Sequence, residues 1–546
     1  MRRPSPPDEP RFVLAARTMV ESGEWLLPMR GSQLYAEKPP PFMWLQAAAY
    51  KVVGSWDVAF LLPSLIAALL TLWFTYDIAR RSWGREVGGY AALALFATVQ
   101  FGLMAKRAQI DMVLVAMTTG ALWGLLRHLL KGPDWTGLAI AGFLSGLGTV
   151  TKGVGFLPLA LLVPFAFIRH RRVPGSHAAP GRTALVLMLA FVAGTLVWLG
   201  PLGIALLGDN DPVLKSYARE LLFKQTGTRY VAAWHHVQPA WYYLKVIATV
   251  WLPGCLLLPW LIAPWWRRCR RGDARYILLL GWAVLVFIFF TVSPGKREVY
   301  IFPALPAVCI AAAPLLRSVL LLRVPAIVLR TYLAVVTVIS MAIGYGLLSH
   351  LPAVQKALAG RDVAVLAQHR LGIWMIVISG ALFVITLLAR RTRLGVALVS
   401  ASAVLWLVYG IGLMPTLDPY ASSAQLMQQV ASRMSATDEL GMIDWREQNY
   451  LQSDRAVRDF GFKTSIAAQW TGAMRWVAES PNTRYLMLSQ QAASRCTADM
   501  SRDLVGMANR NVWLLLRGDR ALAVCAAARG PVESGRGQSG VEEQVE

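Results

Sequence analysis

The chain has 546 residues, 56% of them hydrophobic, and a formal net charge of +23. A mean hydropathy of +0.46 over this length excludes an ordinary soluble protein. The basic charge could indicate a nucleic-acid partner, but it falls in short loops between apolar runs, so nucleic acid is not expected as a partner.

Residues 1–57 precede the first long apolar run and are rich in Trp and Pro. Their apolar side chains recur at roughly helical spacing, which predicts a helix lying on the membrane surface: Phe12, Leu14, Ala15, Met19 and Val20. The segment also holds an acidic pair, Asp8-Glu9, close to Arg11. Ionisable groups at a membrane edge are a functional-site hypothesis by default.

Apolar runs of membrane-spanning character follow in residues 58–414. We predict twelve, near 58–79, 87–104, 111–131, 136–150, 154–168, 183–207, 241–265, 275–292, 299–316, 325–349, 371–389 and 394–414. Because backbone groups in lipid must satisfy one another, an α-helical polytopic bundle is expected. A long loop, 208–240, interrupts it.

Lys and Arg alternate strongly between successive short loops. The richer set lies at 80–85, 127–131, 169–182, 267–275, 317–323 and 390–393. The positive-inside rule makes this set cytoplasmic, with anionic lipid contact as a secondary use. Residues 1–57, the loop 208–240 and everything after 415 are then external. Carrying 1–57 across a membrane requires a preceding helix, so we expect one transmembrane helix to be encoded upstream of Met1.

Residues 415–530 lose the long apolar runs and predict a small α/β domain. Expected strands are 440–443, 485–488 and 512–516, and expected helices are 422–435, 468–478 and 497–509. Residues 531–546 are rich in Gly, Ser and Glu and are expected to be disordered. Cys496 and Cys525 could form a disulfide in an oxidising compartment or remain two independent thiols.

The mixed-sign polar clusters all fall on the predicted external side. They are Asp8-Glu9, Glu37-Lys38, Lys106-Arg107 with Asp111, Lys152, His235-His236, and Lys296-Arg297 with Tyr300. Each has an ordinary alternative. Asp8 or Asp111 could cap a helix, Lys152 and Lys296 could snorkel at helix ends, and the histidines alone are weak evidence for a metal.

Together, carboxylates and several cations on one face suit a lipid-phosphate substrate. Lys and Arg would neutralise phosphate oxygens, and a carboxylate would take the proton of an incoming acceptor. Phosphate leaves without protonation, so such a site requires a base more than an acid.

Five motifs in order make the chain resemble the bacterial aminoarabinose transferase family, GT-C glycosyltransferases related to protein O-mannosyltransferases. They are Asp8-Glu9-x-Arg11 with Tyr35-x-Glu37-Lys38-Pro39-Pro40, Arg107-x-x-x-Asp111, Thr151-Lys152-Gly153, His235-His236-x-x-Pro239, and Gly295-Lys296-x-x-x-Tyr300. The resemblance covers residues 8–315 well and the remainder only in architecture. Pro10 and Arg297-Glu298 depart from the commonest pattern, which leaves the sugar and the acceptor open.

The resemblance implies a GT-C bundle with a small C-terminal α/β periplasmic domain in the bacterial inner membrane. It also implies inverting transfer of a sugar, such as 4-amino-4-deoxy-L-arabinose, from undecaprenyl phosphate to lipid A or a related envelope acceptor. Asp8, with Glu9, would be the catalytic carboxylate. Glu37, His235 and His236 could share a divalent cation. Carrier phosphate or sugar would be held by Arg11, Tyr35, Lys38, Arg107, Asp111, Lys152, Lys296 and Tyr300.

Three alternatives remain at this stage: a hexose donor, a protein or other glycan as acceptor, or a lipid flippase without chemistry. A transporter would be expected to show inverted repeats with charges near the bilayer midplane. The sequence has no evident internal repeat, and its mixed charges gather at one face, which favours the enzyme.

Overall fold

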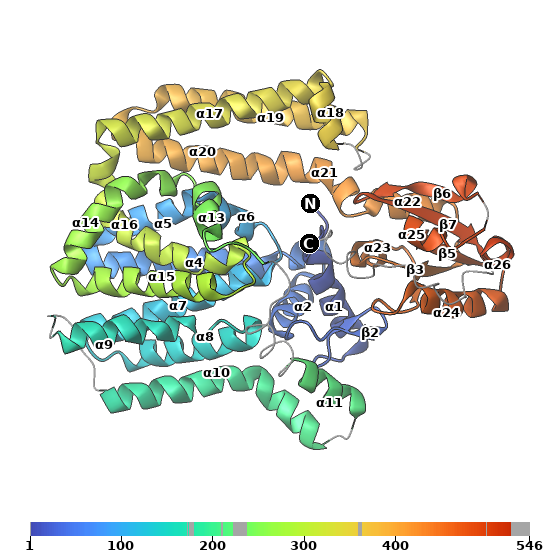
Figure 1. Cartoon of the computed structure of the whole chain (residues 1–546), viewed down its shortest axis with the longest axis horizontal. Coiled ribbons are helices and arrows are strands. Elements are labelled where there is room, and N and C mark those ends of the chain that lie inside the picture. Colours follow the sequence, from blue (N-terminus) through green and yellow to red (C-terminus); the bar gives the residue numbers. More distant parts are fainter. Residues whose placement is uncertain are drawn as a thin grey trace.

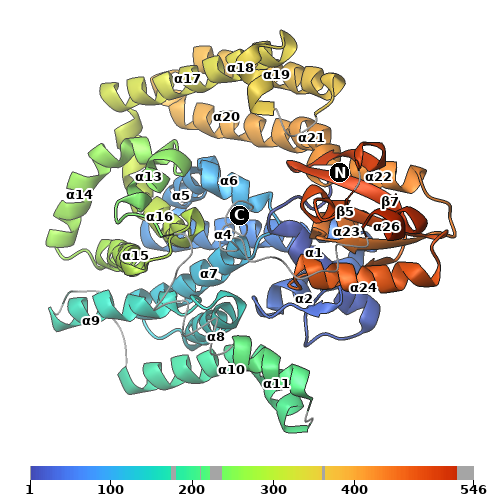
Figure 2. The same ribbon diagram turned by 45° about the vertical axis from the view of Figure 1, so that its right-hand side comes forward.

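The computed structural model describes residues 2–171, 173, 180–208, 211–221, 237–358, 363–497 and 499–525. The molecule is elongated (Figure 1), with a helical bundle toward one end of its long axis and a small sheet domain at the other. The N-terminal segment, in dark blue, lies between them in both views (Figures 1 and 2). The histidine pair His235-His236 and the tail 531–546 lie outside the described residues.

The bundle consists of helices that run mostly along the long axis (Figure 1). Its first half is α4 (Leu62–Trp83), α5 (Arg85–Ala97), α6 (Val99–Ala105), α7 (Ile110–Lys131), α8 (Trp135–Lys152), η1 (Leu157–Leu161), α9 (Leu162–His170), α10 (Pro180–Gly208) and α11 (Pro212–Arg219). Its second half is α13 (Tyr242–Val250), η3 (Gly254–Leu257), α14 (Leu258–Arg270), α15 (Ala274–Val292), η4 (Glu298–Ile301), α16 (Ala304–Leu320), α17 (Arg323–Leu348), α18 (Pro352–Leu358), α19 (Val365–Leu388), η5 (Arg391–Arg393), α20 (Leu394–Val408), the π-helical turn η6 (Tyr409–Leu413) and α21 (Met414–Ala421).

Each of the twelve apolar segments predicted from the sequence contains helix. Among the described residues, seven helices are long and apolar enough to cross a membrane, and two bent helix pairs would raise the number to nine. The pairs are α5–α6, bent by 73°, and α13 with the segment Gly254–Arg270, bent by 106°. The segments near 154–168 and 299–316 form shorter apolar helices, Leu157–His170 and Ala304–Leu320. The segment near 136–150 forms α8, which has 18 residues but is not among the helices apolar enough to cross a membrane.

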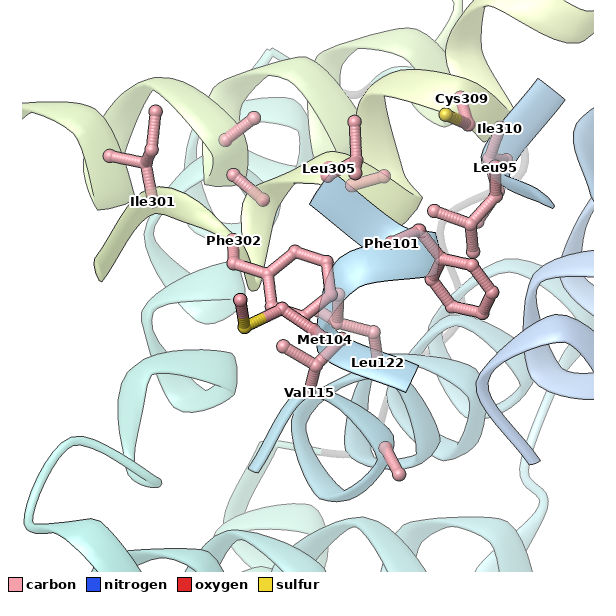
Figure 3. Packing of buried hydrophobic residues seen from close by; sticks show 14 of the residues in the cluster. Leu95, Phe101, Met104, Val115, Leu122, Ile301, Phe302, Leu305, Cys309 and Ile310 are labelled. Carbon is pink, nitrogen blue, oxygen red and sulfur yellow. The ribbon is translucent and has the colours of Figure 1, made fainter. Parts of the chain in front are cut away.

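The bend at Thr98 directs α6 toward the elements that carry the later motifs. Thr98 is extended, with φ −77° and ψ 132°. Figure 3 shows Phe101 and Met104 of α6 in the apolar cluster that also holds Phe302 and Leu305. The Gln100 amide donates to the carbonyl of Glu298 at 3.0 Å, so the bend also fixes η4.

Glycines let α7, α8 and α10 pack backbone to backbone. A Cβ on Gly124 of α7 would lie 2.0 Å from the carbonyl oxygen of Gly137 in α8. A Cβ on Gly146 of α8 would lie 2.0 Å from the carbonyl oxygen of Phe191 in α10. Small residues permit such close helix contacts in membrane proteins. The close packing holds α8 beside α7 along its length, and with it the end that carries Lys152.

The N-terminal segment contains α1 (Glu9–Ser22), the two-residue strands β1 (Met29–Arg30) and β2 (Gln33–Leu34), α2 (Pro41–Val53) and α3 (Trp56–Ala59). The helix predicted from Phe12, Leu14, Ala15 and Met19 is present, but these side chains are buried inside the protein. Phe12 packs with the bundle core, whereas Leu14 packs with the C-terminal domain. The expectation that this face lies on lipid is therefore wrong, because α2 and the bundle core cover Phe12, Ala15 and Met19, and the C-terminal domain covers Leu14.

The C-terminal domain is a five-stranded mixed sheet in the order β4-β3-β5-β7-β6. Its elements are α22 (Ala424–Ser432), β3 (Glu439–Ile443), α23 (Glu447–Leu451), β4 (Val457–Asp459), α24 (Ile466–Glu479), β5 (Arg484–Ser489), α25 (Gln490–Ala493), η7 (Ser501–Asp503), β6 (Leu504–Ala508), β7 (Asn511–Arg517) and α26 (Gly518–Val524). Alternate strand residues face opposite sides. Leu486 and Leu488 pack with α24, while Met487 faces the side where Leu14 of α1 packs.

The prediction of a small α/β domain is confirmed, but one of its predicted helices is wrong. Residues 497–509 form η7 and strand β6 instead of a helix, because β6 pairs antiparallel with β7. The two-residue hairpin turn that joins them, Asn509-Arg510, has positive φ at both positions (51° and 65°), as a type I′ turn requires. Cys496 and Cys525 form a disulfide.

Candidate active site

The acidic pair Asp8-Glu9 lies at the start of α1, at the junction of the bundle, the N-terminal segment and the C-terminal domain. The two neighbouring carboxylates have different surroundings. Asp8 is the N-cap of α1, but its side chain makes no capping hydrogen bond, so the helix-cap alternative for Asp8 is wrong.

Glu9 is buried and fully engaged. Both Nη atoms of Arg2 donate to its two carboxylate oxygens at 2.5 Å. The backbone N–H groups of Ser5 and Ala108 donate to it at 2.9 and 2.8 Å. Four donors leave little capacity for a substrate proton, so Glu9 acts as a positioning group that fixes the turn between α6 and α7.

Asp8 is more open, with its side chain 17% exposed. It accepts a hydrogen bond from Gln109 Nε2 at 3.2 Å. Its other polar neighbours are cations at longer range: Arg11 Nη1 at 3.9 Å and Arg297 Nη2 at 3.8 Å. An accessible carboxylate with cations beside it suits proton removal or orientation at an anionic substrate.

Arg11 connects the acidic pair to the C-terminal domain. Its guanidinium lies 3.9 Å from Glu37 and 3.4 Å from Glu447 of α23. Arg30 forms an ion pair with the same Glu447 oxygen and lies 3.8 Å from Glu37. Arg30 and Glu447 are both buried, so the C-terminal domain contributes a carboxylate beneath the site.

Glu37 lies among three cations, the third being Lys463 at 3.4 Å. Burial opposes its ionisation, but the charges of Arg11, Arg30 and Lys463 hold the Glu37 pKa below its ordinary value. Burial likewise disfavours the Arg11 guanidinium, yet Tyr35, Glu447, Glu37 and Asp8 raise the Arg11 pKa. Both groups therefore stay charged at neutral pH.

Asp111 and Lys152 form a second ion pair at the same end of the bundle. Asp111 is in the first turn of α7, whose N-cap is Gln109, so the N-cap alternative for Asp111 is wrong. Lys152 also lies 5.5 Å from the ring centre of Tyr300. These three predicted residues are brought together from α7, α8 and η4.

Lys296 is buried and does not snorkel. Its Nζ donates to the carbonyls of Gln238 at 3.0 Å and Ser293 at 2.9 Å. Val237 forms an isolated β-bridge with Gly295. Lys296 thus holds the described end of the long loop 208–240 in place. Its neighbour Arg297 lies 3.8 Å from Asp8.

The remaining predicted residues surround this network. Tyr35 is buried, and burial raises the pKa of its phenol. Lys38 and Arg107 are half-buried in the turns after β2 and α6. Among the described residues, no group of three or more His, Cys, Asp or Glu side chains could hold a metal ion. Whether Glu37 shares a divalent cation with His235 and His236 stays a prediction, because the histidines lie outside the described residues.

Sequence reasoning missed Arg2, Arg30, Gln109, Glu447 and Lys463, which all contact predicted residues. Gln109 lies inside the motif Arg107-x-x-x-Asp111, and Arg2 lies six residues before Asp8, so both could have been found by examining the motifs and their flanks. Glu447 and Lys463 are more than 400 residues from their partners, and no local pattern marks them.

Among the described residues, the site therefore combines two partly exposed carboxylates, Asp8 and Glu37, with an excess of guanidinium and ammonium groups. Glu37 lies 3.4 Å from Lys463, whereas the cations nearest to Asp8 are 3.8 and 3.9 Å away. Such an arrangement can bind a phosphate ester and stabilise it as a leaving group. It can also accept a proton from a nucleophile held beside Asp8.

Comparisons with known proteins show which families and structures the chain is similar to. Residues 37–198 match the family described as dolichyl-phosphate-mannose-protein mannosyltransferase. The undecaprenyl phosphate-alpha-4-amino-4-deoxy-L-arabinose arabinosyl transferase 1 of Pseudomonas fluorescens is 28% identical over 307 residues, 55% of this chain and 51% of that protein. A second such transferase, from another strain of the species, is 30% identical over 335 residues, 59% of this chain and 53% of that protein. The chain spans about half the length of the curated relatives it matches.

A crystal structure of ArnT from Cupriavidus metallidurans bound to undecaprenyl phosphate superposes with a TM-score of 0.72 at 19% identity. The superposition covers 97% of this chain and 96% of that one. The apo structure gives 0.68 at 18% identity.

The bundle, the bent helices and the C-terminal sheet domain define a polytopic membrane protein with the fold of the ArnT crystal structure. Within that class, the chain is related in sequence and in fold to the bacterial aminoarabinose transferase family, and the resemblance drawn from its motifs is confirmed.

Proposed function

We propose that this chain is an inner-membrane glycosyltransferase that uses an undecaprenyl-phosphate-linked sugar. The observation that carries the proposal is the environment of Asp8: an accessible carboxylate with Arg11 and Arg297 on either side. In this proposal the sugar is 4-amino-4-deoxy-L-arabinose, which the names of the relatives support. The proposed acceptor is lipid A, which is what the motif resemblance implies.

In the proposed reaction, an acceptor oxygen attacks the anomeric carbon from the face opposite the carrier phosphate. The new C–O bond forms as the bond to the phosphate oxygen breaks, which inverts the anomeric carbon. The acceptor's proton passes to the Asp8 carboxylate. The bonding electrons leave with the undecaprenyl phosphate, whose charge the site cations neutralise.

Individual cations take different parts. Arg297 and Arg11 flank Asp8 and are placed to meet the phosphate. Lys152, which contacts Asp111 and Tyr300, is proposed to contact the donor from a second side. Lys38 and Arg107, in the turns after β2 and α6, add further positive charge for the carrier phosphate. Lys296 acts through the loop end at Gln238, because its ammonium is bonded to backbone carbonyls.

Placement of this site on the periplasmic side is part of the proposal. The richer set of basic loops belongs to the other end of the bundle, as the positive-inside rule expects of cytoplasmic loops. The Cys496–Cys525 disulfide in the C-terminal domain suits an oxidising compartment.

Mass spectrometry of lipid A from cells with and without the gene tests the substrates. We expect a mass increase of one aminopentose that appears with the wild-type chain and not with Asp8→Asn. An unchanged spectrum would refute lipid A as the acceptor, and a hexose increment would refute the donor. In proteoliposomes, movement of a labelled donor across the bilayer without any covalent product would instead support the flippase alternative.

A further inference from the structure

The bundle end opposite Asp8 carries a hollow of about 550 Å³. It lies where α4 and α7 end and α8 begins. Its lining, called here the basic hollow, is Arg81, Arg127, Lys131, Gly132, Pro133, Asp134, Trp135 and Thr136. None of these residues has a part in the proposed reaction.

The cations of the basic hollow are held in place by partners. Asp77, buried in α4, forms ion pairs with Arg80 and Arg81. Arg127 pairs with Asp134 at 2.5 Å and lies over the Trp123 ring at 4.4 Å. These contacts preorganise two guanidinium groups at the rim, so a bound anion would meet them without further ordering.

Positive charge is left over after this pairing. Within the described part of the chain, Lys131 has no hydrogen bond or ion pair. Arg182, at the start of α10, lies over the Trp135 ring at 5.2 Å and adds a further cation. Asp77 and Asp134 therefore do not balance the surrounding Lys and Arg side chains.

The loop that forms the floor of the hollow is fixed by a buried histidine. His128 of α7 is fully buried. Its Nδ1 accepts a hydrogen bond from the backbone N–H of Asp134 at 3.2 Å, and its Nε2 lies 3.1 Å from Thr183 Oγ1. The Asp134 side chain also accepts from the Gly137 N–H at 2.8 Å. The hollow is therefore a built feature of the fold that joins α7, α8 and α10.

Its depth in the membrane follows from α7. This helix of 22 residues begins beside the Asp8 site and ends at Lys131. At 1.5 Å per residue it spans about 33 Å, close to the thickness of a bilayer hydrocarbon core, about 30 Å. The hollow thus lies at the level of lipid headgroups, where Trp135 is also favoured.

We propose that the basic hollow binds the phosphate headgroup of an anionic phospholipid. Guanidinium groups match phosphate oxygens in pairs, and basic pockets between membrane helices are suited to such headgroups. The position at the ends of two candidate spans, Trp56–Trp83 and Ile110–Lys131, favours a lipid over a soluble phosphate.

Native mass spectrometry of the full chain in detergent, titrated with cardiolipin and with phosphatidylcholine, tests the proposal. Each neutralised cation should weaken cardiolipin binding about fivefold, so Arg127→Gln with Lys131→Gln should weaken it about 25-fold. The matched control is Arg390→Gln with Arg393→Gln, which removes two exposed basic side chains of another predicted cytoplasmic loop and should change binding less than about twofold.

Lys131→Gln alone provides a second variant if the double variant folds poorly, since Lys131 is exposed and its loss leaves no partner unpaired. Equal losses of cardiolipin binding in the hollow variants and the control variant would show that cardiolipin is attracted by the overall basic charge, and would overturn the proposed site. Full displacement of cardiolipin by millimolar inorganic phosphate would assign the hollow to soluble phosphates and would overturn the lipid assignment.

Discussion

The two ends of α7 carry charge in different ways. At the start, Asp111 is buried against Lys152, and the nearby Asp8, Glu9 and Glu37 each face one or more cations from distant segments. At the end, Arg127 and Lys131 lie at an open rim with few carboxylates around them. Mixed, mostly buried charge marks the first end, and exposed basic charge marks the second.

The difference shows that charge composition alone does not locate function in this molecule. Basic residues at the far end are what the positive-inside rule expects of cytoplasmic loops, so under the proposed orientation most of them have a topological reason. Carboxylates and cations brought together from six or more segments at the near end have no topological reason. Desolvating such groups costs free energy, and this cost is one reason why we propose that they serve the chemistry.

The largest expected effect is at Asp8. Asp8→Asn preserves the shape of the side chain and removes the proton acceptor, so transfer should fall about 10²–10⁴-fold. The measurement is the initial rate of product formation from a labelled carrier-linked sugar in proteoliposomes. A loss smaller than tenfold would assign the proton to another group.

The next effect concerns the docking of the C-terminal domain. Glu447→Gln removes the nearest counter-charge of Arg30 and Arg11 and leaves them only the more distant Glu37, and breaking a buried pair typically costs about 3–5 kcal/mol. The melting temperature should fall and the amides of α1 should exchange faster with solvent. Glu479→Gln, which breaks an exposed pair with Arg484, is the matched control and should cost less than about 1 kcal/mol. Equal shifts in both variants would contradict a buried role for Glu447.

A smaller, pH-dependent effect is expected at Glu37. Its folded-state pKa lies below the ordinary value of 4.5, so ionised Glu37 stabilises the folded chain above that pH. The contribution is lost as the pH falls through the folded-state pKa. The melting temperature of Glu37→Gln should therefore lie below that of the wild type at pH 7, and the gap should close in acid below pH 4.5. A difference in melting temperature that widens in acid would contradict a lowered folded-state pKa of Glu37.

The smallest effect on transfer is expected at the far end of α7. Arg127→Gln in detergent should change the transfer rate less than about twofold, because its charge lies about one bilayer thickness from Asp8. The initial rate of product formation, measured as for Asp8→Asn but in detergent, gives this effect. A loss as large as that of Asp8→Asn would abolish the distinction between the two ends.

Most of the bundle and much of the site could be predicted from the sequence, for identifiable physical reasons. Apolar runs specify helices because lipid forces the backbone to pair internally. Short motifs placed Asp111, Lys152 and Tyr300, because each motif sits at a helix end that the bundle gathers at one face.

Other features depend on contacts across the chain. The burial of α1 results from packing on α2 and the bundle on one side and on the C-terminal domain on the other, and Leu14 carries no local sign of the second contact. Strand β6 exists because β7 pairs with it, which overrides local preference. The different environments of Asp8 and Glu9 arise from the nearby Arg2 and from Ala108, Gln109 and Arg297, and only the fold brings the last three near.

The central claim is that chemistry belongs to the mixed-charge end of α7. The most direct measurement compares Asp8→Asn with the double variant Arg127→Gln and Lys131→Gln in one proteoliposome transfer assay, with donor binding measured in parallel. We predict that Asp8→Asn binds the donor normally and forms almost no product, while the double variant retains most of its turnover. Normal turnover by Asp8→Asn, or equal losses in the two variants, would contradict the claim.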